Sequence, residues 1–216
     1  MSIPALLDHI VIAGPDLAEV IRWFEERTGV RAAPGGVHPT GTANALVALS
    51  IGGRRGPQYI ELIGPDPDRP DPALPQAFGI PRLTEPTLVT YAVHPADLDA
   101  VLARARAEGY DPGDVQDLSR RAPSGELLRW RLSRAPEPRR PEVPFLIDWG
   151  ATAHPGLGDL PVIELLSFTR AEPDPEALHL LTDALGLGDG VAEIREGTEA
   201  RYLLRLRAAE GSELEL

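Results

Sequence analysis

Residues 7–12 read LDHIVI, a short apolar strand that leads to a helix start at Asp16. An Asp side chain there can accept hydrogen bonds from the free amides of a first helical turn, and the apolar residues that follow have helical spacing. The same succession returns at residues 88–93, LVTYAV, with a second helix start at Asp97. A repeated pattern of this kind predicts a chain built from similar structural units.

Each predicted unit contains one helix and several strands. In the first unit, segments 37–49 and 58–63 follow the helix and have the composition of strands, and segments 127–132 and 144–149 do so in the second. A strand-helix-three-strand (βαβββ) unit has one apolar sheet face that it cannot bury alone, so two such units must pair. We therefore expect an α+β fold with a cavity between paired units.

The distribution of Pro residues along the chain indicates where the modules begin and end. We expect a first module at residues 1–64, a Pro-rich linker at 65–86 and a second module at 87–155. Proline disfavours helices and central strands, so the linker should cross the surface. Residues 160–216 contain one helix-like segment and several strand-like stretches, which indicates a partial third βαβββ-like module. A dimerising or capping appendage is the alternative.

The composition also excludes several classes of function. The net charge of −12 argues against nucleic acid and anionic membranes as partners, because both bind basic surfaces. The chain has no Cys, and all its basic residues other than His are Arg, so thiolate and Schiff-base chemistry are ruled out. Any metal must be held by His and carboxylates. No segment has the pattern of a signal peptide or a membrane span, and we expect a cytoplasmic protein.

Four positions should face the cavity between the modules, because they lie on the first and last strands of the two units. They are His9, Glu61, Thr90 and Asp148. Glu61 lies between Ile60 and Leu62, and an inward carboxylate in such a strand is costly to bury without a cation or hydrogen-bond donors.

Several short motifs resemble the glyoxalase-like domain of the vicinal oxygen chelate superfamily. They are LDH at residues 7–9, GGVH at 35–38, GTAN at 41–44 and YIELIG at 59–64. The superfamily includes glyoxalase I, extradiol dioxygenases, epimerases, fosfomycin thiol transferases and bleomycin-sequestering proteins. The resemblance implies paired βαβββ modules that form a cupped mixed sheet, the glyoxalase/bleomycin resistance/dihydroxybiphenyl dioxygenase-like fold, around a site that commonly holds a divalent metal.

The resemblance also implies metal ligands. His9 and Glu61 match ligand positions of the family, and Asp148, as the second-unit counterpart of Glu61, would complete the set or act as a base. Imidazole and carboxylate ligands suit Fe, Mn, Ni or Zn. Thr90 departs from the family pattern, because metal-dependent relatives often have His or Gln at that position. A metal-free binding pocket is therefore the alternative.

Other polar and aromatic residues are candidates for catalysis or substrate binding. His38 follows two glycines, where it could act as a general base or bind an anionic group, a surface loop His being the alternative. Asn44, Thr90, Trp149 and His154 are candidates for substrate binding. His94 and His179 are expected to have structural roles.

These observations favour a metal-dependent lyase, isomerase or dioxygenase that acts on a small substrate with vicinal oxygens. One alternative is a metal-free protein that sequesters a small molecule, as bleomycin-resistance proteins do. The other is a structural or regulatory homodimer formed through the third module.

Overall fold

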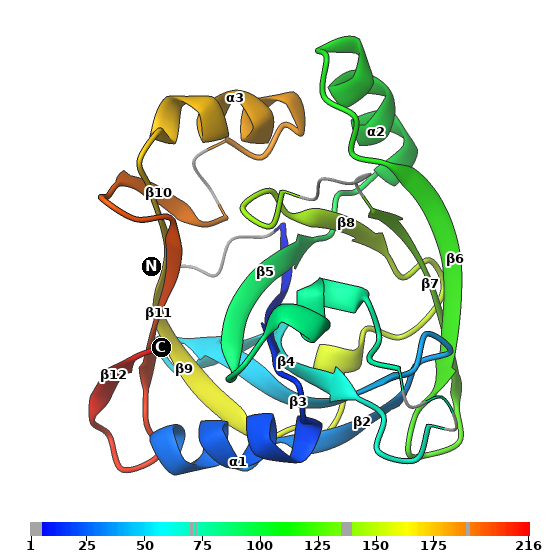
Figure 1. Ribbon diagram of the computed structural model, residues 1–216, viewed down its shortest axis with the longest axis vertical. Coiled ribbons are helices and arrows are strands. Elements are labelled where there is room, and N and C mark those ends of the chain that lie inside the picture. The colour runs from blue at the N-terminus through cyan, green and yellow to red at the C-terminus, as the bar shows by residue number, and fades with distance from the viewer. Residues whose placement is uncertain (1–5, 70, 72, 135–139, 189–190) are drawn as a thin grey trace.

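The computed structural model describes residues 6–69, 71, 73–134, 140–188 and 191–216. Its strands form one mixed sheet in the order β12-β11-β9-β3-β4-β1-β5-β8-β7-β6, with β2 and β10 paired to β3 and β9 outside this path. The helices lie at the two ends of the strand assembly (Figure 1).

The first module has the predicted strand-helix-three-strand order. Its elements are β1 (Leu7–Ala13), α1 (Leu17–Thr28), β2 (Ala33–Val37), β3 (Thr42–Ile51) and β4 (Arg54–Pro65). The helix begins where expected, because the Asp16 side chain accepts a hydrogen bond from the Glu19 amide at 3.0 Å. It ends at Gly29, whose φ of 67° favours glycine. β1 pairs in parallel with β4, which places His9 opposite Tyr59.

The second module repeats this arrangement. Its elements are β5 (Thr87–Val93), α2 (Leu98–Ala107), β6 (Asp114–Arg121), β7 (Leu127–Arg134) and β8 (Phe145–Asp148). β5 pairs in parallel with β8, and β1 pairs antiparallel with β5 to join the two modules. The expectation of an α+β fold with paired βαβββ modules is confirmed. Before β5, the described residues of the Pro-rich stretch include the short 3₁₀ helix η1 (Ala77–Arg82).

The third segment extends the same sheet with a different strand order. Its elements are η2 (Pro155–Leu157), β9 (Val162–Glu172), α3 (Pro175–Ala184), β10 (Glu193–Glu196), β11 (Arg201–Arg207) and β12 (Glu213–Glu215). β9 pairs in parallel with the end of β3, which makes the sheet continuous. In the first two modules the first strand pairs with the last, whereas β9 pairs with β10 and β11.

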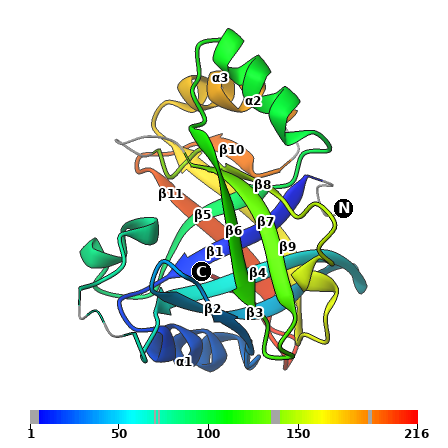
Figure 2. The same cartoon turned by 90° about the vertical axis from the view of Figure 1, so that its right-hand side faces the viewer.

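The helices and the core hold the three parts together. α2 and α3 lie at one end of the molecule and α1 at the other (Figures 1 and 2). Arg104 Nε on α2 donates a hydrogen bond to the Ala184 carbonyl on α3 at 3.2 Å. Tyr91 of the second module packs edge to face with Phe168 of the third segment, with ring centroids 5.2 Å apart. No helix in the described ranges is long and apolar enough to cross a membrane.

Candidate functional site

The concave face between the first two modules contains a cavity, which we call the cup. Its polar lining comes from nine side chains, which are His9, His38, Thr40, Thr42, Asn44, Tyr59, Glu61, Arg120 and Arg134. Strand alternation brings Tyr59, Glu61 and Ile63 of β4 to the same face. Aromatic walls come from Phe78, Trp130, Phe145 and Trp149. The Pro-rich stretch therefore contributes to the cup, because Phe78 belongs to η1.

His9 and Glu61, which were predicted to face a cavity between the modules, approach each other inside the cup. His9 Nε2 lies 3.6 Å from Glu61 Oε2, and both side chains are more than nine-tenths buried. Asn44 Nδ2 on β3 donates a hydrogen bond to Glu61 Oε1 at 2.6 Å. The Tyr59 ring stacks on the His9 imidazole with centroids 4.7 Å apart. The first module alone thus provides an imidazole and an amide that both approach the same carboxylate.

Asp8 orients His9 from behind. His9 Nδ1 lies 2.7 Å from Asp8 Oδ1, and because a carboxylate only accepts, the ring proton is assigned to Nδ1. The lone pair of Nε2 then points toward Glu61. Burial raises the pKa of Asp8, but hydrogen bonds from His154 and His9 outweigh that effect, and the net result is a pKa well below its ordinary value. Asp8 is therefore ionised at neutral pH.

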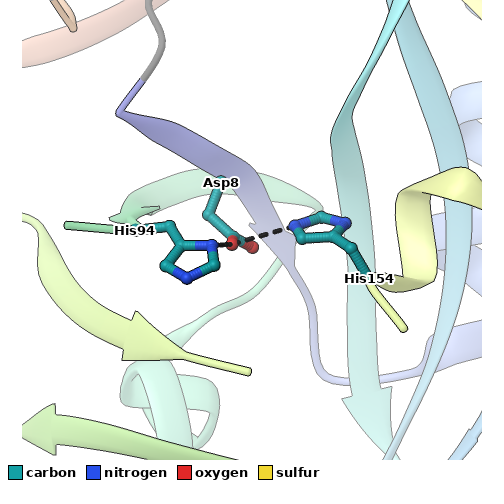
Figure 3. A group of neighbouring side chains, drawn as sticks. All are labelled: Asp8, His94 and His154. Carbon is teal, nitrogen blue, oxygen red and sulfur yellow. Dashed lines mark hydrogen bonds and ion pairs between the residues drawn. The ribbon is translucent and has the colours of Figure 1, made fainter. Parts of the chain in front are cut away.

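A second group of ligand-type atoms lies on the other side of Asp8. Asp8 Oδ2 lies 3.0 Å from His154 Nε2 and 3.5 Å from His94 Nδ1, so the carboxylate sits between two imidazoles (Figure 3). Within the described part of the chain, Asp8, His94 and His154 are the group of His and acidic side chains that could hold a metal, with ligand atoms all within 4.8 Å of one another. Trp149 Nε1 donates a hydrogen bond to the same oxygen of Asp8 at 3.0 Å.

The hydrogen bonds of His154 disfavour a metal in this group. The Gly156 amide donates to His154 Nδ1 at 3.1 Å, so that nitrogen carries no proton in the neutral ring. The proton is then on Nε2, which donates it to Asp8. A metal needs a free lone pair on its ligand nitrogen, and here Nε2 has none. We interpret the three residues as a hydrogen-bonded support for His9.

His38 lies at the rim of the cup on the chain after β2. Its Nδ1 lies 2.9 Å from the Thr42 hydroxyl. Burial lowers the pKa of His38, Glu61 partly opposes that change, and Arg120 adds to it. The imidazole is therefore neutral at neutral pH and able to accept a proton.

Two predicted residues do not line the cup. Asp148 Oδ2 lies 3.7 Å from Arg131 Nη1, and its Oδ1 accepts a hydrogen bond from the Gly150 amide at 2.8 Å. Its neighbours Ile147 and Trp149 line the cup instead, because alternate residues of a strand point to opposite faces. Thr90 is buried on β5 and is not among the lining residues.

Of the two residues Trp149 and His154, both predicted to bind substrate, only Trp149 is among the residues that line the cup. Trp149 lines the cup and contacts Asp8, while His154 contacts Asp8 from outside the cup lining.

The sequence analysis missed Asp8, His94 and Arg120. His94 was expected to have a structural role, and its Nδ1 lies 3.5 Å from Asp8 Oδ2 in the Asp8, His94 and His154 group. Asp8 belongs to the LDH motif at residues 7–9. Its position next to His9 on a buried strand was the observation that could have indicated a role in the site. Arg120 lies on β6, which was not predicted because Val115 and Leu118 are its only apolar residues.

Comparisons with known proteins agree with this architecture. A family model described as "Glyoxalase-like domain" matches residues 7–186. A search of curated proteins finds no significant match. The crystal structure of a hypothetical protein from Staphylococcus aureus is similar at 14% identity, with a TM-score of 0.59 and 97% of each chain covered.

Methylmalonyl-CoA epimerase structures are also among the similar structures. The enzyme from Mycobacterium tuberculosis is 22% identical, with a TM-score of 0.42, and the alignment covers 68% of this chain and 88% of that one. A methylmalonyl-CoA epimerase bound to methylmalonyl-CoA is 23% identical, with a TM-score of 0.42, and the alignment covers 70% of this chain and 99% of that one.

Proposed function

Because the chain belongs to the glyoxalase-like domain family of the vicinal oxygen chelate superfamily, we propose that the cup is the active site of a metal-dependent enzyme. His9 and Glu61 would hold a divalent metal, and the substrate would be a small molecule with adjacent oxygens. The observation that carries the proposal is the 3.6 Å approach of His9 Nε2 to Glu61 Oε2 inside a buried pocket.

The chemistry of this pair supports a cation between the two groups. A lone pair and a carboxylate that face each other away from water repel one another unless a proton or a metal lies between them. Two ligands bound at about 2.1 Å to one zinc-like metal lie roughly 3–4 Å apart, which matches the spacing of these atoms. Nitrogen and oxygen ligands suit Fe, Mn, Ni or Zn.

The surroundings of the pair also have the form expected at a metal site. Metal-binding His residues usually donate their other ring N–H to a carboxylate, as His9 does to Asp8, and ligating carboxylates are usually hydrogen-bonded, as Glu61 is to Asn44. Two protein ligands leave coordination positions open for substrate oxygens. When bound, the metal would polarise those oxygens and stabilise negative charge on them.

Two residues of the cup would contribute to catalysis. His38 is neutral at neutral pH and lines the cup, so it can take a proton from a bound substrate. Asn44 holds Glu61 in place through its amide. Lyase, isomerase and dioxygenase reactions are all compatible with these roles.

A second candidate function is metal-free binding of a small molecule. It is favoured by the absence, among the described residues, of a third His, Asp or Glu within ligand distance of His9 and Glu61. Thr90, at the corresponding position of the second module, is not in the cup. In that case a proton on His9 Nε2 would occupy the space between the two side chains.

Metal analysis tests the choice between these functions. We expect protein purified without chelator to carry a first-row divalent metal, and added metal to raise its melting temperature. His9→Ala and Glu61→Gln should lose both properties. His179→Ala, on α3, is the matched control and should retain both.

His94→Ala separates the two candidate sites. The proposal requires this variant to bind metal nearly as the wild type does, because His94 only supports Asp8. If no metal stabilises the wild type, or if His94→Ala abolishes binding while His9→Ala does not, the cup is not the metal site.

A further inference from the structure

A buried cation lies in the cup beside the His9–Glu61 pair. Arg120 is 6% exposed, comes from β6 of the second module, and lines the cup together with His38 and Asn44. Its Nη1 donates a hydrogen bond to the Gly35 carbonyl on β2 at 2.6 Å. Across the described ranges, no carboxylate oxygen lies within 4.0 Å of its guanidinium.

This arrangement leaves the guanidinium charge without a counter-ion. Burying a cation is costly unless it is paired, and one carbonyl satisfies only one of the five N–H donors of an Arg side chain. Burial lowers the pKa of Arg120, and the longer-range influence of Tyr59 and Glu61 only partly offsets that effect. Arg remains charged in proteins under such conditions, so the cup contains a permanent positive charge.

The glycines before His38 make room for this guanidinium. A Cβ on Gly36 would lie 2.8 Å from Arg120 Nη1 and 2.5 Å from the Arg121 carbonyl oxygen, closer than real Cβ contacts allow. A Cβ on Gly35 would collide with Asn44 Oδ1. The Gly35–Gly36 pair therefore gives both polar side chains their places in the cup.

Asn44 supplies a second unsatisfied group next to the cation. Its Nδ2 is used by Glu61, whereas its Oδ1 is buried and has no hydrogen-bond partner in the described residues. Unsatisfied buried polar atoms are uncommon in folded proteins and often mark places where a ligand or water completes the hydrogen bonding.

A purely structural role would account for only part of these observations. The bond from Arg120 to Gly35 ties β6 to β2 and so helps to close the two modules around the cup. That bond uses one N–H donor, and no other hydrogen bond of the buried guanidinium is made within the described ranges. The remaining donors belong to a side chain that lines the cup, where a ligand would be able to accept them.

We propose that Arg120 binds the carboxylate of the substrate, so that the cup takes a small organic acid with an oxygen substituent next to its acid group. The planar fork of a guanidinium matches a carboxylate, and also a phosphate, through two parallel hydrogen bonds. The acid would lie with its carboxylate at Arg120 and its neighbouring oxygen toward His9 and Glu61. This inference deepens the proposed function and rests on it.

Binding of simple probes tests the proposal. We expect lactate, which has adjacent carboxylate and hydroxyl oxygens, to raise the melting temperature of the wild type and to bind measurably by calorimetry. Lactamide, the neutral analogue, should bind much more weakly. Arg120→Gln should lose roughly tenfold or more in affinity for lactate, the usual cost of removing a charge-assisted hydrogen bond.

Two further variants control for folding and for general charge. Arg121→Gln removes the next Arg on β6, which is exposed and donates to the Gly125 carbonyl, and it should bind lactate as the wild type does. Arg120→Lys keeps the charge but not the fork, so intermediate affinity is expected. Circular dichroism of each variant verifies that it is folded.

The possible outcomes distinguish carboxylate binding by Arg120 from metal binding by His9 and Glu61. Lactate binding that survives in His9→Ala but is lost in Arg120→Gln supports Arg120 independently of any metal. Inorganic phosphate binding more tightly than lactate, with the same loss in Arg120→Gln, would support an oxyanion site while replacing the carboxylate by a phosphate. Equal binding of lactate and lactamide, unchanged binding in Arg120→Gln, or no binding of either anion would overturn the proposal.

Discussion

Asp8 connects the two modules at the level of single side chains. It lies on β1, yet it accepts hydrogen bonds from Trp149 and His154, which follow β8 in the second module. Its other oxygen accepts from His9, which lines the cup. Any change at Asp8 should therefore affect both the orientation of His9 and the packing of the two modules.

We predict that Asp8→Asn destabilises the fold by roughly 2–4 kcal/mol, because it breaks a buried network of donors around one carboxylate. The pKa of Asp8 is lower in the folded state than its ordinary value. Its contribution to stability is therefore complete above a pH of about 4 and shrinks as the pH falls below that value. Urea unfolding at neutral and progressively more acidic pH measures the difference between wild type and variant.

Asp159→Asn, in an exposed position, serves as the control and should change stability by no more than about 0.5 kcal/mol. A difference between wild type and Asp8→Asn that grows at acidic pH would contradict the assigned role of the carboxylate.

The position of a single side chain could be predicted only where the sequence indicated which face of the strand it lies on. His9 and Glu61 were singled out because each is a polar residue within an apolar strand, and both line the cup. Asp148 was aligned with Glu61, but β8 presents Ile147 and Trp149 to the cup, so the alignment was one residue out of register. An apolar strand buried on both faces gives no signal that fixes such a register.

At the scale of elements, the three helices start in the same way. Asp16, Asp97 and Asp174 each accept a hydrogen bond from the amide three residues later, at distances of 3.0, 2.9 and 3.1 Å. The first two were predicted from the repeat, and the third from the helix-like segment near the C-terminal end. Capping residues can be predicted from the sequence because their hydrogen bonds to the first helical turn are local and do not depend on tertiary contacts.

We predict that Asp16→Ala and Asp97→Ala each lower the free energy of unfolding by about 1 kcal/mol. The two helices lie at opposite ends of the molecule, so the double variant should lose the sum of the two effects (Figure 1). Chemical denaturation measures both values. Asp97→Ser retains a capping oxygen and should be nearly neutral, whereas an equal loss in the Ser and Ala variants would argue against capping.

Elements with weak apolar patterns were not predictable. Six of the eight residues of β6 are polar or charged, and the segment is a strand because it pairs along its whole length with β7. The order of strands in the third segment depends on long-range pairing of β9 with β3, which leaves no local signature.

At the scale of the whole molecule, all three parts share one hydrophobic core. Buried residues of the first module, such as Ile10, belong to the same cluster as Tyr91, Phe168 and Tyr202. The Phe168 and Tyr202 rings stack with centroids 5.5 Å apart. The third segment is therefore packed as part of the same domain core.

We predict one cooperative unfolding transition for the chain, with tryptophan fluorescence and far-ultraviolet circular dichroism giving the same midpoint. Phe168→Ala should shift that single transition and cost roughly 3–5 kcal/mol, because it opens a cavity in the shared core. Leu180→Ala, at a position 71% exposed, is the control and should have little effect. A separate early transition in Phe168→Ala would show that the third segment unfolds independently.

The sheet is open, and its described strand order ends at β6 on one side and β12 on the other. Unpaired strand edges invite polymerisation between molecules unless charged side chains discourage it. Both ends have such charges, with Asp114, Asp117 and Arg121 on β6 and Glu213 and Glu215 on β12. The polar character that made β6 difficult to predict is therefore expected to oppose aggregation through this edge, and exchange of these charges for apolar residues should promote aggregation in concentrated solution.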